Sequence, residues 1–111
     1  MEDSTVVKVL KALADPKRFR MIQEIAAAGE LNCTQVVERF HLSQPAISHH
    51  LKILKDVGLL LVRQEAQLHY ISVNQDLLDE LVGLLPARLT AKKKSVAKEK
   101  SVAKSKVVVR S

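Results

Sequence analysis

A pair of short helical segments followed by two β-rich runs is the sequence feature that most narrowly limits the fold. The apolar spacing predicts one helix over about residues 34–40 and another over about 43–57, with only a tight connection between them. After Gly58, residues 59–63 and 68–73 are β-rich and are joined by a polar segment, which indicates a hairpin. Two closely spaced helices followed by a β-hairpin are typical of a winged helix-turn-helix.

Three further helices complete the predicted fold. Apolar residues at helical spacing predict a first helix over about residues 5–14. Asp15 and the proline after it start a second helix, which ends at Gly29. A last helix is capped by Asn74 and closed by Pro86. The predicted fold is therefore mainly α with a β-hairpin wing, in the order α-α-α-α-β-β-α. The apolar face of the second helix is predicted to consist of Phe19, Ile22, Ile25 and Ala26.

The basic charge of the chain is concentrated at its C-terminal end. The formal net charge is +6, but residues 1–90 hold 10 Lys and Arg against 11 Asp and Glu. Residues 91–111 hold 8 Lys and Arg against one Glu, in a Lys/Ser/Val/Ala repeat that matches no helical period. We therefore predict a DNA-binding winged helix-turn-helix domain over residues 1–90 and a disordered basic tail over residues 91–111. The tail is either a solubilising end or, as we favour, an arm that adds non-specific affinity for nucleic-acid phosphates.

Composition argues against several classes of function. No apolar run is long enough to cross a bilayer and the N-terminal residues are acidic, so neither export nor membrane insertion is expected. The single cysteine, Cys33, cannot form an internal disulfide, which favours a reducing compartment. The predicted location is the cytoplasm, in association with the nucleoid. Neither a phosphate-binding glycine loop nor a paired nucleophile and base is present, so we expect neither an enzyme nor a cofactor.

The helix over residues 43–57 has two chemically different faces. One face is apolar and also carries His50, which we expect to be packed and hydrogen-bonded. The opposite face has no carboxylate, and its Gln, Ser, His and Lys side chains suit contacts with base edges and phosphates in a major groove. Ser43 caps the helix, and the free backbone N–H groups of the first turn are expected to face a phosphate. The opposite face consists of Gln44, Pro45, Ser48, His49, Lys52 and Lys55.

Two stretches of the chain resemble the ArsR/SmtB-type winged-helix transcriptional repressors. They read ALADPKRFRMI over residues 12–22 and LSQPAISHHLKILKDVGL over residues 42–59, and the resemblance extends over about residues 5–85. It implies a homodimer, held together by its first and last helices, that represses a palindromic operator in double-stranded DNA. The resemblance assigns groove contacts to Gln44, Pro45, Ser48 and His49, and a place in the wing to Arg63. Together with the residue chemistry, this predicts DNA contacts from Ser43, Gln44, Pro45, Ser48, His49, Lys52, Lys55, Arg63 and Gln67.

The sequence departs from that family where many members bind metal. Such members read ELCVCDL at the entry to the third helix, whereas this chain reads ELNCTQV over residues 30–36, with Cys33 between the two changed cysteine positions. The last helix has Asp76, Asp79 and Glu80 but no histidine. Because both sets of ligands are incomplete, we predict no metal site. Cys33 is either a redox-active thiol or, as we favour, a small and partly buried side chain.

The wing departs from the family as well. Related wings often read RREGR, whereas residues 63–67 read RQEAQ, so two arginines and the turn glycine are missing. We expect fewer phosphate contacts from the hairpin tip and hypothesise that the basic tail replaces them. The predicted function is that of a sequence-specific, dimeric repressor whose effector the sequence does not identify. Two alternatives stay open: an architectural DNA-compacting protein with little sequence specificity, and a protein-interaction module that has lost DNA binding.

Overall fold

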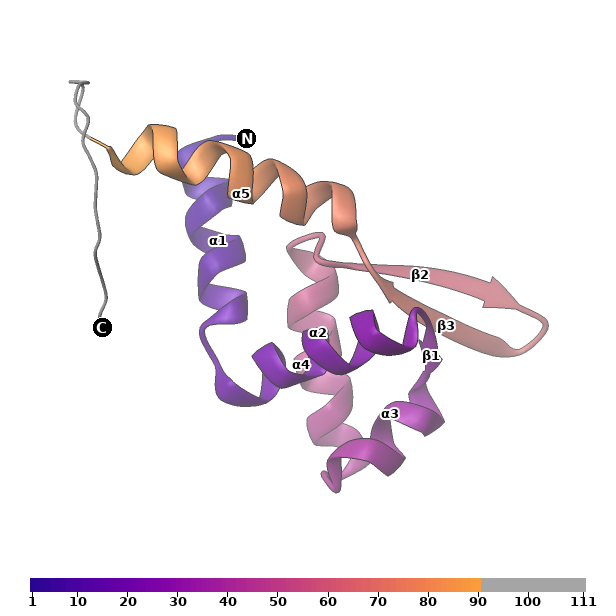
Figure 1. Cartoon of the computed structure of the whole chain (residues 1–111). Coiled ribbons are helices and arrows are strands. Elements are labelled where there is room, and N and C mark those ends of the chain that lie inside the picture. Colours follow the sequence, from indigo (N-terminus) through magenta and orange to yellow (C-terminus); the bar gives the residue numbers. More distant parts are fainter. Residues whose placement is uncertain (91–111) are drawn as a thin grey trace. The chain divides into compact units, whose positions relative to one another are not determined.

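Five helices and three strands make up the part of the chain that the structure describes (Figure 1). The computed structural model describes residues 1–90, and the predicted basic tail lies outside the described residues. The chain divides after Leu81 into two parts, and the last helix crosses this division. The elements are α1 (Asp3–Leu13), α2 (Pro16–Ala28), β1 (Leu31–Asn32), α3 (Cys33–Phe40), α4 (Gln44–Asp56), β2 (Leu60–Glu65), β3 (Leu68–Val73) and α5 (Gln75–Leu89).

The predicted boundaries of the second helix are confirmed. The Asp15 carboxylate accepts hydrogen bonds from the backbone N–H groups of Lys17 and Arg18, both at 3.0 Å. Pro16 occupies the first position of α2, where its missing N–H costs nothing. At the other end, Gly29 has a φ of 84°, in the left-handed region that disfavours a side chain. The local chemistry of the helix ends therefore sets the length of α2.

The buried face of α2 differs from the predicted one. Met21, Ile22 and Ile25 are buried, whereas the Phe19 side chain is 52% exposed and Ala26 is exposed. The predicted stripe and the observed stripe both contain Ile22 and Ile25. Helical periodicity alone could not choose between them, because each has apolar residues at the required spacing.

A short strand, β1, was not predicted. Leu31 pairs with Ile71 of β3, and the resulting antiparallel sheet has the order β1-β3-β2. Two residues are too few for an alternating pattern to be visible in the sequence. Asn32 also caps α3, because its side chain accepts a hydrogen bond from the Gln35 N–H at 2.9 Å and its own N–H donates to the Gln35 side chain at 2.8 Å. As a result, α3 begins at Cys33, one residue earlier than predicted.

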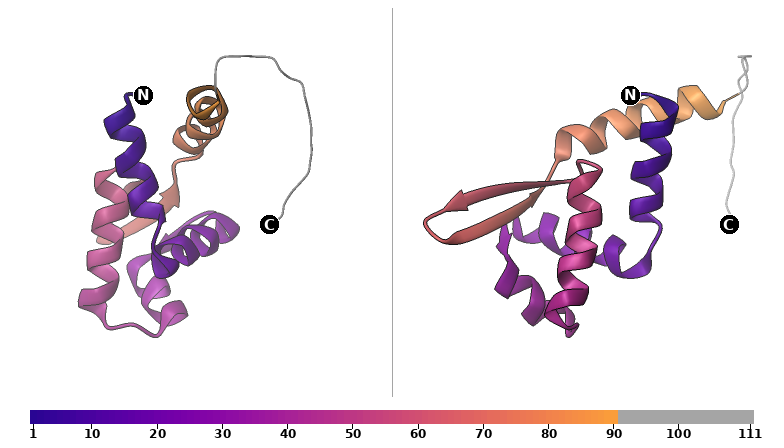
Figure 2. Two further views of the ribbon diagram at one scale, coloured as in Figure 1. Left: turned by 90° about the vertical axis from the view of Figure 1, so that its left-hand side faces the viewer. Right: turned by 180° about the vertical axis from the view of Figure 1, so that it is seen from behind.

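The hairpin of β2 and β3 has a shorter turn than predicted. Glu65 still pairs with Leu68, so that only Ala66 and Gln67 form the turn. Ala66 takes a φ of 56°, a conformation that a glycine would adopt more easily. The polar residues at the end of β2 are exposed strand residues, which explains why the sequence resembled a longer loop. The hairpin extends beyond the helices of the Met1–Leu81 part (Figure 2).

The prediction that Pro86 closes the last helix is wrong. Helix α5 continues through Pro86 to Leu89. Proline removes the N–H that would bond four residues back, but so little helix follows that the loss is confined to the final turn. The predicted start is confirmed, since the Asn74 side chain accepts a hydrogen bond from the Leu77 N–H at 3.2 Å and donates to the Gly58 carbonyl at 2.9 Å.

The core of the Met1–Leu81 part is built from the apolar faces of its helices and one face of the sheet. Helix α4 packs against α1, α2, α3 and β2 and so lies at the centre of these contacts. No polar or charged residue within residues 1–90 is buried. The apolar face of α4 is buried against several elements, and these contacts hold the helix in place. The buried residues with the largest side chains are Met21, Ile25, Ile47, Leu54 and Leu59.

Candidate nucleic-acid interface

The outward face of α4 brings together the residues that the sequence predicted for groove contacts. Ile47, Leu51 and Leu54 are buried and attach the opposite face of the helix to the core. This orientation leaves the predicted contact residues on the exposed side, where none is covered by the rest of the described chain. These exposed residues are Ser43, Gln44, Pro45, Ser48, His49, Lys52 and Lys55.

The first turn of α4 has fewer free N–H groups than expected. The Ser43 hydroxyl accepts a hydrogen bond from the Ala46 N–H at 3.3 Å, and the Ser43 carbonyl accepts from the Ile47 N–H at 3.0 Å. Pro45 has no N–H to offer. The capping interaction therefore competes with the predicted backbone contact to a phosphate, and side chains are left as the main donors of this turn.

A carboxylate lies closer to the contact face than the sequence indicated. The Lys52 ammonium donates a hydrogen bond to the Asp56 carboxylate one turn later, at 2.9 Å. Both side chains are largely exposed, and exposed pairs of this kind contribute little free energy. Lys52 can exchange this partner for a phosphate, whereas Lys55 has no ion-pair partner within the described residues.

His50 is packed and hydrogen-bonded, as predicted. Its Nδ1 lies 3.4 Å from Nη1 of Arg18, and since a guanidinium can only donate, Nδ1 is the acceptor. Burial is the main cause that lowers the pKa of the His50 imidazole; the charge of Asp15 opposes this shift, and the charge of Arg18 adds to it. The neutral ring with its proton on Nε2 is therefore the favoured form, and His50 supports α4 from behind.

Arg18 connects α4 to the end of α1. Its Nε donates to the Ala12 carbonyl at 2.7 Å, and its Nη2 donates to the Lys11 carbonyl at 3.5 Å. These carbonyls lie in the last turn of α1, where a cation is favoured by the helix dipole. The same guanidinium reaches His50, so α1, α2 and α4 meet at one side chain.

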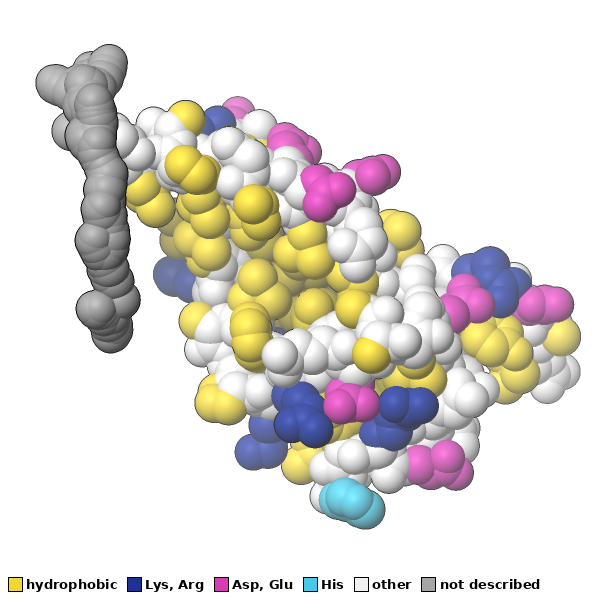
Figure 3. Space-filling view, viewed as in Figure 1, with side chains coloured by type: hydrophobic (Ala, Val, Ile, Leu, Met, Phe, Trp, Pro, Cys, Tyr) yellow, Lys and Arg dark blue, Asp and Glu magenta, His cyan; other side chains and the backbone are white. Residues whose placement is uncertain are grey.

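Two carboxylates, one inside the wing and one outside it, offset the charge of Arg63. Arg63 donates to both carboxylate oxygens of Glu30, at 3.0 and 2.9 Å, and to Glu65 at 2.6 Å. Its guanidinium also lies 4.7 Å from the centre of the Tyr70 ring. Hydrogen bonds from Arg63 lower the pKa of Glu30, and Glu30 and Glu65 raise the pKa of Arg63. Basic and acidic side chains accordingly lie side by side over the hairpin (Figure 3). Gln67, at the hairpin turn, is exposed.

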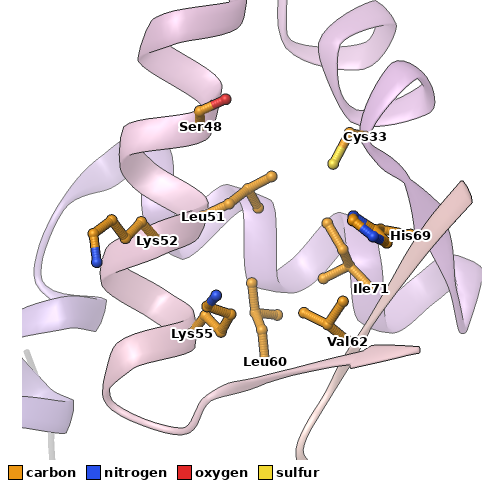
Figure 4. Close-up of a pocket in the computed structure, with 9 residues that line it drawn as sticks. All are labelled: Cys33, Ser48, Leu51, Lys52, Lys55, Leu60, Val62, His69 and Ile71. Atoms are coloured by element: carbon orange, nitrogen blue, oxygen red, sulfur yellow. The ribbon is translucent and has the colours of Figure 1, made fainter. Parts of the chain in front are cut away.

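A groove separates α4 from the sheet. It has a volume of about 400 Å³, and Ser48, Lys52 and Lys55 line it on the side of α4. Cys33, exposed at the start of α3, and His69, on β3, line the other side (Figure 4). The expectation that Cys33 is partly buried is thus wrong, because its side chain lies at the surface and lines an open groove. Sequence reasoning also missed His69, whose position in an alternating strand was its only signal.

Metal ligands do not come together in the part of the chain that the structure describes. Within residues 1–90, no three His, Cys, Asp or Glu side chains are grouped so that they could hold an ion.

None of the helices within residues 1–90 combines the length and the apolar character that crossing a membrane requires.

Comparison with known proteins agrees with this architecture. Residues 15–61 match the family described as bacterial regulatory protein, arsR family. The chain is 32% identical over 88 residues to an arsenical resistance operon repressor of Staphylococcus aureus. The matched region covers 79% of this chain and 84% of the relative. It is 35% identical over 74 residues to the transcriptional repressor SdpR of Bacillus subtilis, covering 67% and 81% of the two chains.

A solved structure supports the same assignment. HlyU from Vibrio cholerae superposes with a TM-score of 0.64 at 31% sequence identity, over 83% of this chain and 100% of that one. Both the matched family and the curated relatives are transcriptional regulators and not enzymes. The predicted winged helix-turn-helix fold is confirmed by this agreement together with the observed helices and hairpin. The chain belongs to the ArsR family and is a DNA-binding transcriptional regulator.

Proposed function

We propose that this protein is a dimeric, sequence-specific repressor that binds a palindromic operator through α4. The observation that supports this most is the placement of the predicted contact residues on the exposed face of a helix whose other face is buried. Gln44, Ser48 and His49 have donors and acceptors of the kind that read base edges. Lys52 and Lys55 have the charge that phosphates attract. Repression is the activity named for the S. aureus and B. subtilis relatives.

The remaining predicted residues have supporting roles in this proposal. Ser43 and Pro45 shape the first turn of α4 and bring it close to the backbone of the duplex. Gln67, at the hairpin turn, contacts the neighbouring groove. Two carboxylates offset the charge of Arg63, which makes the wing a weaker electrostatic contact with a phosphate than an unpaired arginine would be.

Dimerisation through the first and last helices is supported by apolar side chains that the described chain leaves uncovered. On α1, Val7 is 47% and Leu10 is 38% exposed, and apolar side chains gather at the surface in this region (Figure 3). On α5, Val82 and Leu89 are exposed. Covering such side chains with a second copy removes apolar surface from water. A two-fold dimer then presents its recognition helices about 34–36 Å apart, one turn of the duplex.

The inducer of this repressor is proposed not to be a thiophilic metal. The relative from S. aureus is named for arsenical resistance. Here, Cys33 has Asn32 and Thr34 as neighbours, and a single thiol is a poor ligand set for a soft ion. Unchanged operator affinity in the presence of arsenite and Cd²⁺ is the expected result, and release of the DNA by either ion would overturn this part of the proposal.

Selection of binding sites from a random duplex library tests sequence-specific recognition. We expect enrichment of a palindrome and an affinity for it about 10³-fold or more above that for random duplex. Gln44→Ala and His49→Ala should each reduce the specific affinity, whereas Gln23→Ala, an exposed glutamine on α2, serves as the matched control. Failure to enrich any site would favour the architectural alternative. Unchanged affinity in both α4 variants would favour the interaction module.

The contribution of the basic tail is tested in the full-length chain. We propose that its lysines add non-specific phosphate contacts that the wing lacks. Replacing them with glutamine should weaken binding to all duplexes and flatten the dependence of log K on log salt, while the preferred sequence stays the same. A salt dependence that does not change would contradict this role. The lysines to be replaced are Lys92, Lys93, Lys94, Lys98, Lys100, Lys104 and Lys106.

The oligomeric state is measured by sedimentation equilibrium. The intact protein should be a dimer at micromolar concentration, and Leu10→Glu should shift it toward the monomer because a charge is then placed in the proposed interface. Lys11→Gln, at the neighbouring exposed position, makes the same change of −1 in net charge without adding a charge at Leu10, and should leave the dimer intact. A monomeric intact protein would overturn the proposal.

A further inference from the structure

The groove between α4 and the sheet combines an apolar floor with lysine, cysteine and histidine side chains. Neither the packing of the core nor base recognition explains this combination. Its floor is apolar and is formed by Leu51, Leu60, Val62 and Ile71, which come from α4, β2 and β3. Its volume of about 400 Å³ lies within the range of about 300–1,000 Å³ that is typical of small-molecule sites. Val62, which lines the groove, is 48% exposed, so an apolar ligand group has apolar surface to cover.

The charge around the groove has one sign. Lys55 lines the side formed by α4, and no ion pair occupies its ammonium group within the described residues. Lys52 lies on the same side, with its ammonium held by Asp56. No Asp or Glu side chain lines the groove. Figure 4 shows the Lys55 side chain beside Leu60, at the edge of the apolar floor, and the Lys52 side chain directed outward.

The opposite side adds polar groups without adding negative charge. Cys33 comes from the start of α3 and His69 from β3, and both side chains line the groove. A ligand that spans the floor from Lys55 therefore meets a thiol and an imidazole at its far end (Figure 4). An anion with an apolar body fits this arrangement, whereas a cation would face Lys55 without any carboxylate to offset the repulsion.

We propose that this groove is a binding site for a small amphipathic organic anion, with its carboxylate at Lys55 and its apolar body over Leu51, Leu60 and Val62. The passage of a DNA backbone through the groove is the other use that its lysines suggest. A phosphodiester chain would leave the apolar floor without a partner, so the floor favours the organic anion.

Occupancy of the groove also has a consequence for regulation, which rests on the proposed DNA-binding function. Ser48, Lys52 and Lys55 line the groove and belong to the proposed contact face of α4. A bound anion neutralises Lys55 and stands next to the surface that the duplex must approach. The anion and the operator therefore exclude one another, and the anion acts as an inducer.

Binding is tested first without DNA, so that the result does not depend on the proposed function. Octanoate is added to the full-length protein labelled with ¹⁵N, and amide chemical shifts are followed by NMR; octylamine, octanol and inorganic phosphate are compared at the same concentrations. We expect saturable shifts at Cys33, Leu60, Val62 and His69 with octanoate, weaker ones with octanol, and none there with octylamine or phosphate. Equal shifts with octylamine, equal shifts with phosphate, or octanoate shifts centred on Val7 would each overturn the proposal.

A charge variant assigns the anion to Lys55. Lys55→Gln should weaken octanoate binding about two- to fivefold, the factor expected for an exposed ion pair, and should reduce its advantage over octanol. Lys8→Gln, an exposed lysine on α1, makes the same change in net charge away from the groove and should leave octanoate binding unchanged. Equal weakening by both variants would show that only the net charge matters and would overturn the assignment.

The regulatory consequence is measured last, by adding octanoate to a preformed complex with the selected operator duplex. Operator affinity should fall as the octanoate sites fill, by the factor that simple competition gives. An octanoate site in the groove combined with unaltered operator affinity would overturn the inducer role while leaving the site itself in place.

Discussion

The ion pairs of Arg63 in the wing lead to a prediction about DNA affinity: removing one of its carboxylate partners should strengthen binding. Replacing Glu30 with glutamine takes away the carboxylate that holds two of the three guanidinium nitrogens of Arg63. In the wild-type protein, the Glu30 carboxylate offsets the charge of Arg63 and competes with a phosphate for its N–H groups. We therefore expect Glu30→Gln to bind operator DNA more tightly than the wild type.

The size of the effect follows from the exposure of the pair. The Arg63 and Glu30 side chains are 51% and 37% exposed, so solvent screens their attraction. An exposed pair of this kind corresponds to about a two- to fivefold change in an equilibrium constant, which is the gain in affinity we expect at low salt. Glu65 still holds the third nitrogen in the single variant, at 2.6 Å. The double variant Glu30→Gln, Glu65→Gln should therefore gain more, and its slope of log K against log salt should steepen by about 0.9 for one added phosphate contact.

Fluorescence anisotropy of a labelled operator duplex, titrated at several KCl concentrations, measures both quantities. Glu38→Gln is the matched control, since it removes one exposed carboxylate from α3 without touching Arg63. Equal gains in Glu30→Gln and Glu38→Gln would refute the reasoning, because only the net charge would then matter. Weaker binding by Glu30→Gln would refute it more directly, by showing that the ion pair holds the wing in its binding conformation.

Three further predictions concern stability and follow from single side chains. Leu54→Ala should lower the free energy of unfolding by about 2–5 kcal/mol in urea titrations, because Leu54 is fully buried; a loss below about 1 kcal/mol would contradict its place in the core. Asn32→Ala should lower the free energy of unfolding by about 0.5–2 kcal/mol, because the capping box of α3 is lost. Asn74→Ala removes the cap of another helix, α5, and tests whether the cost is specific to α3. Since burial lowers the pKa of His50 below its ordinary value of 6.5, the unfolded chain binds more protons, and stability should rise with pH up to about that value. His50→Gln should flatten this rise in thermal melts between about pH 5 and pH 7.5, and an unchanged pH profile would show that His50 does not cause it.

The parts of the fold that depend on neighbouring residues could be predicted from the sequence. Asp15 with its proline, Gly29 and Asn74 each determine a helix end through contacts within a few residues, and the structure places those ends where predicted. The exposed polar face of α4 was also predictable, because a helix that buries one stripe must expose the other.

Features that depend on distant partners could not be predicted. Strand β1 exists because Leu31 finds Ile71, and two residues have no periodicity to reveal this. Arg63 looked like a free cation of the wing, but its main partner, Glu30, lies 33 residues earlier in the chain. The groove with His69 and Cys33 likewise arises from the packing of α3, α4 and the sheet. In each case the missing information is a tertiary contact.

Arg18 contacts both α1 and α4, two helices that do not follow one another in the chain. One guanidinium is shared between the final carbonyls of α1 and the imidazole behind α4. Displacing the end of α1 while α4 stays still must therefore lengthen or break at least one of these bonds. In the proposed dimer, α1 joins the two copies of the protein. The orientation of α4 in each copy then depends on how the two copies pack, because Arg18 contacts both helices.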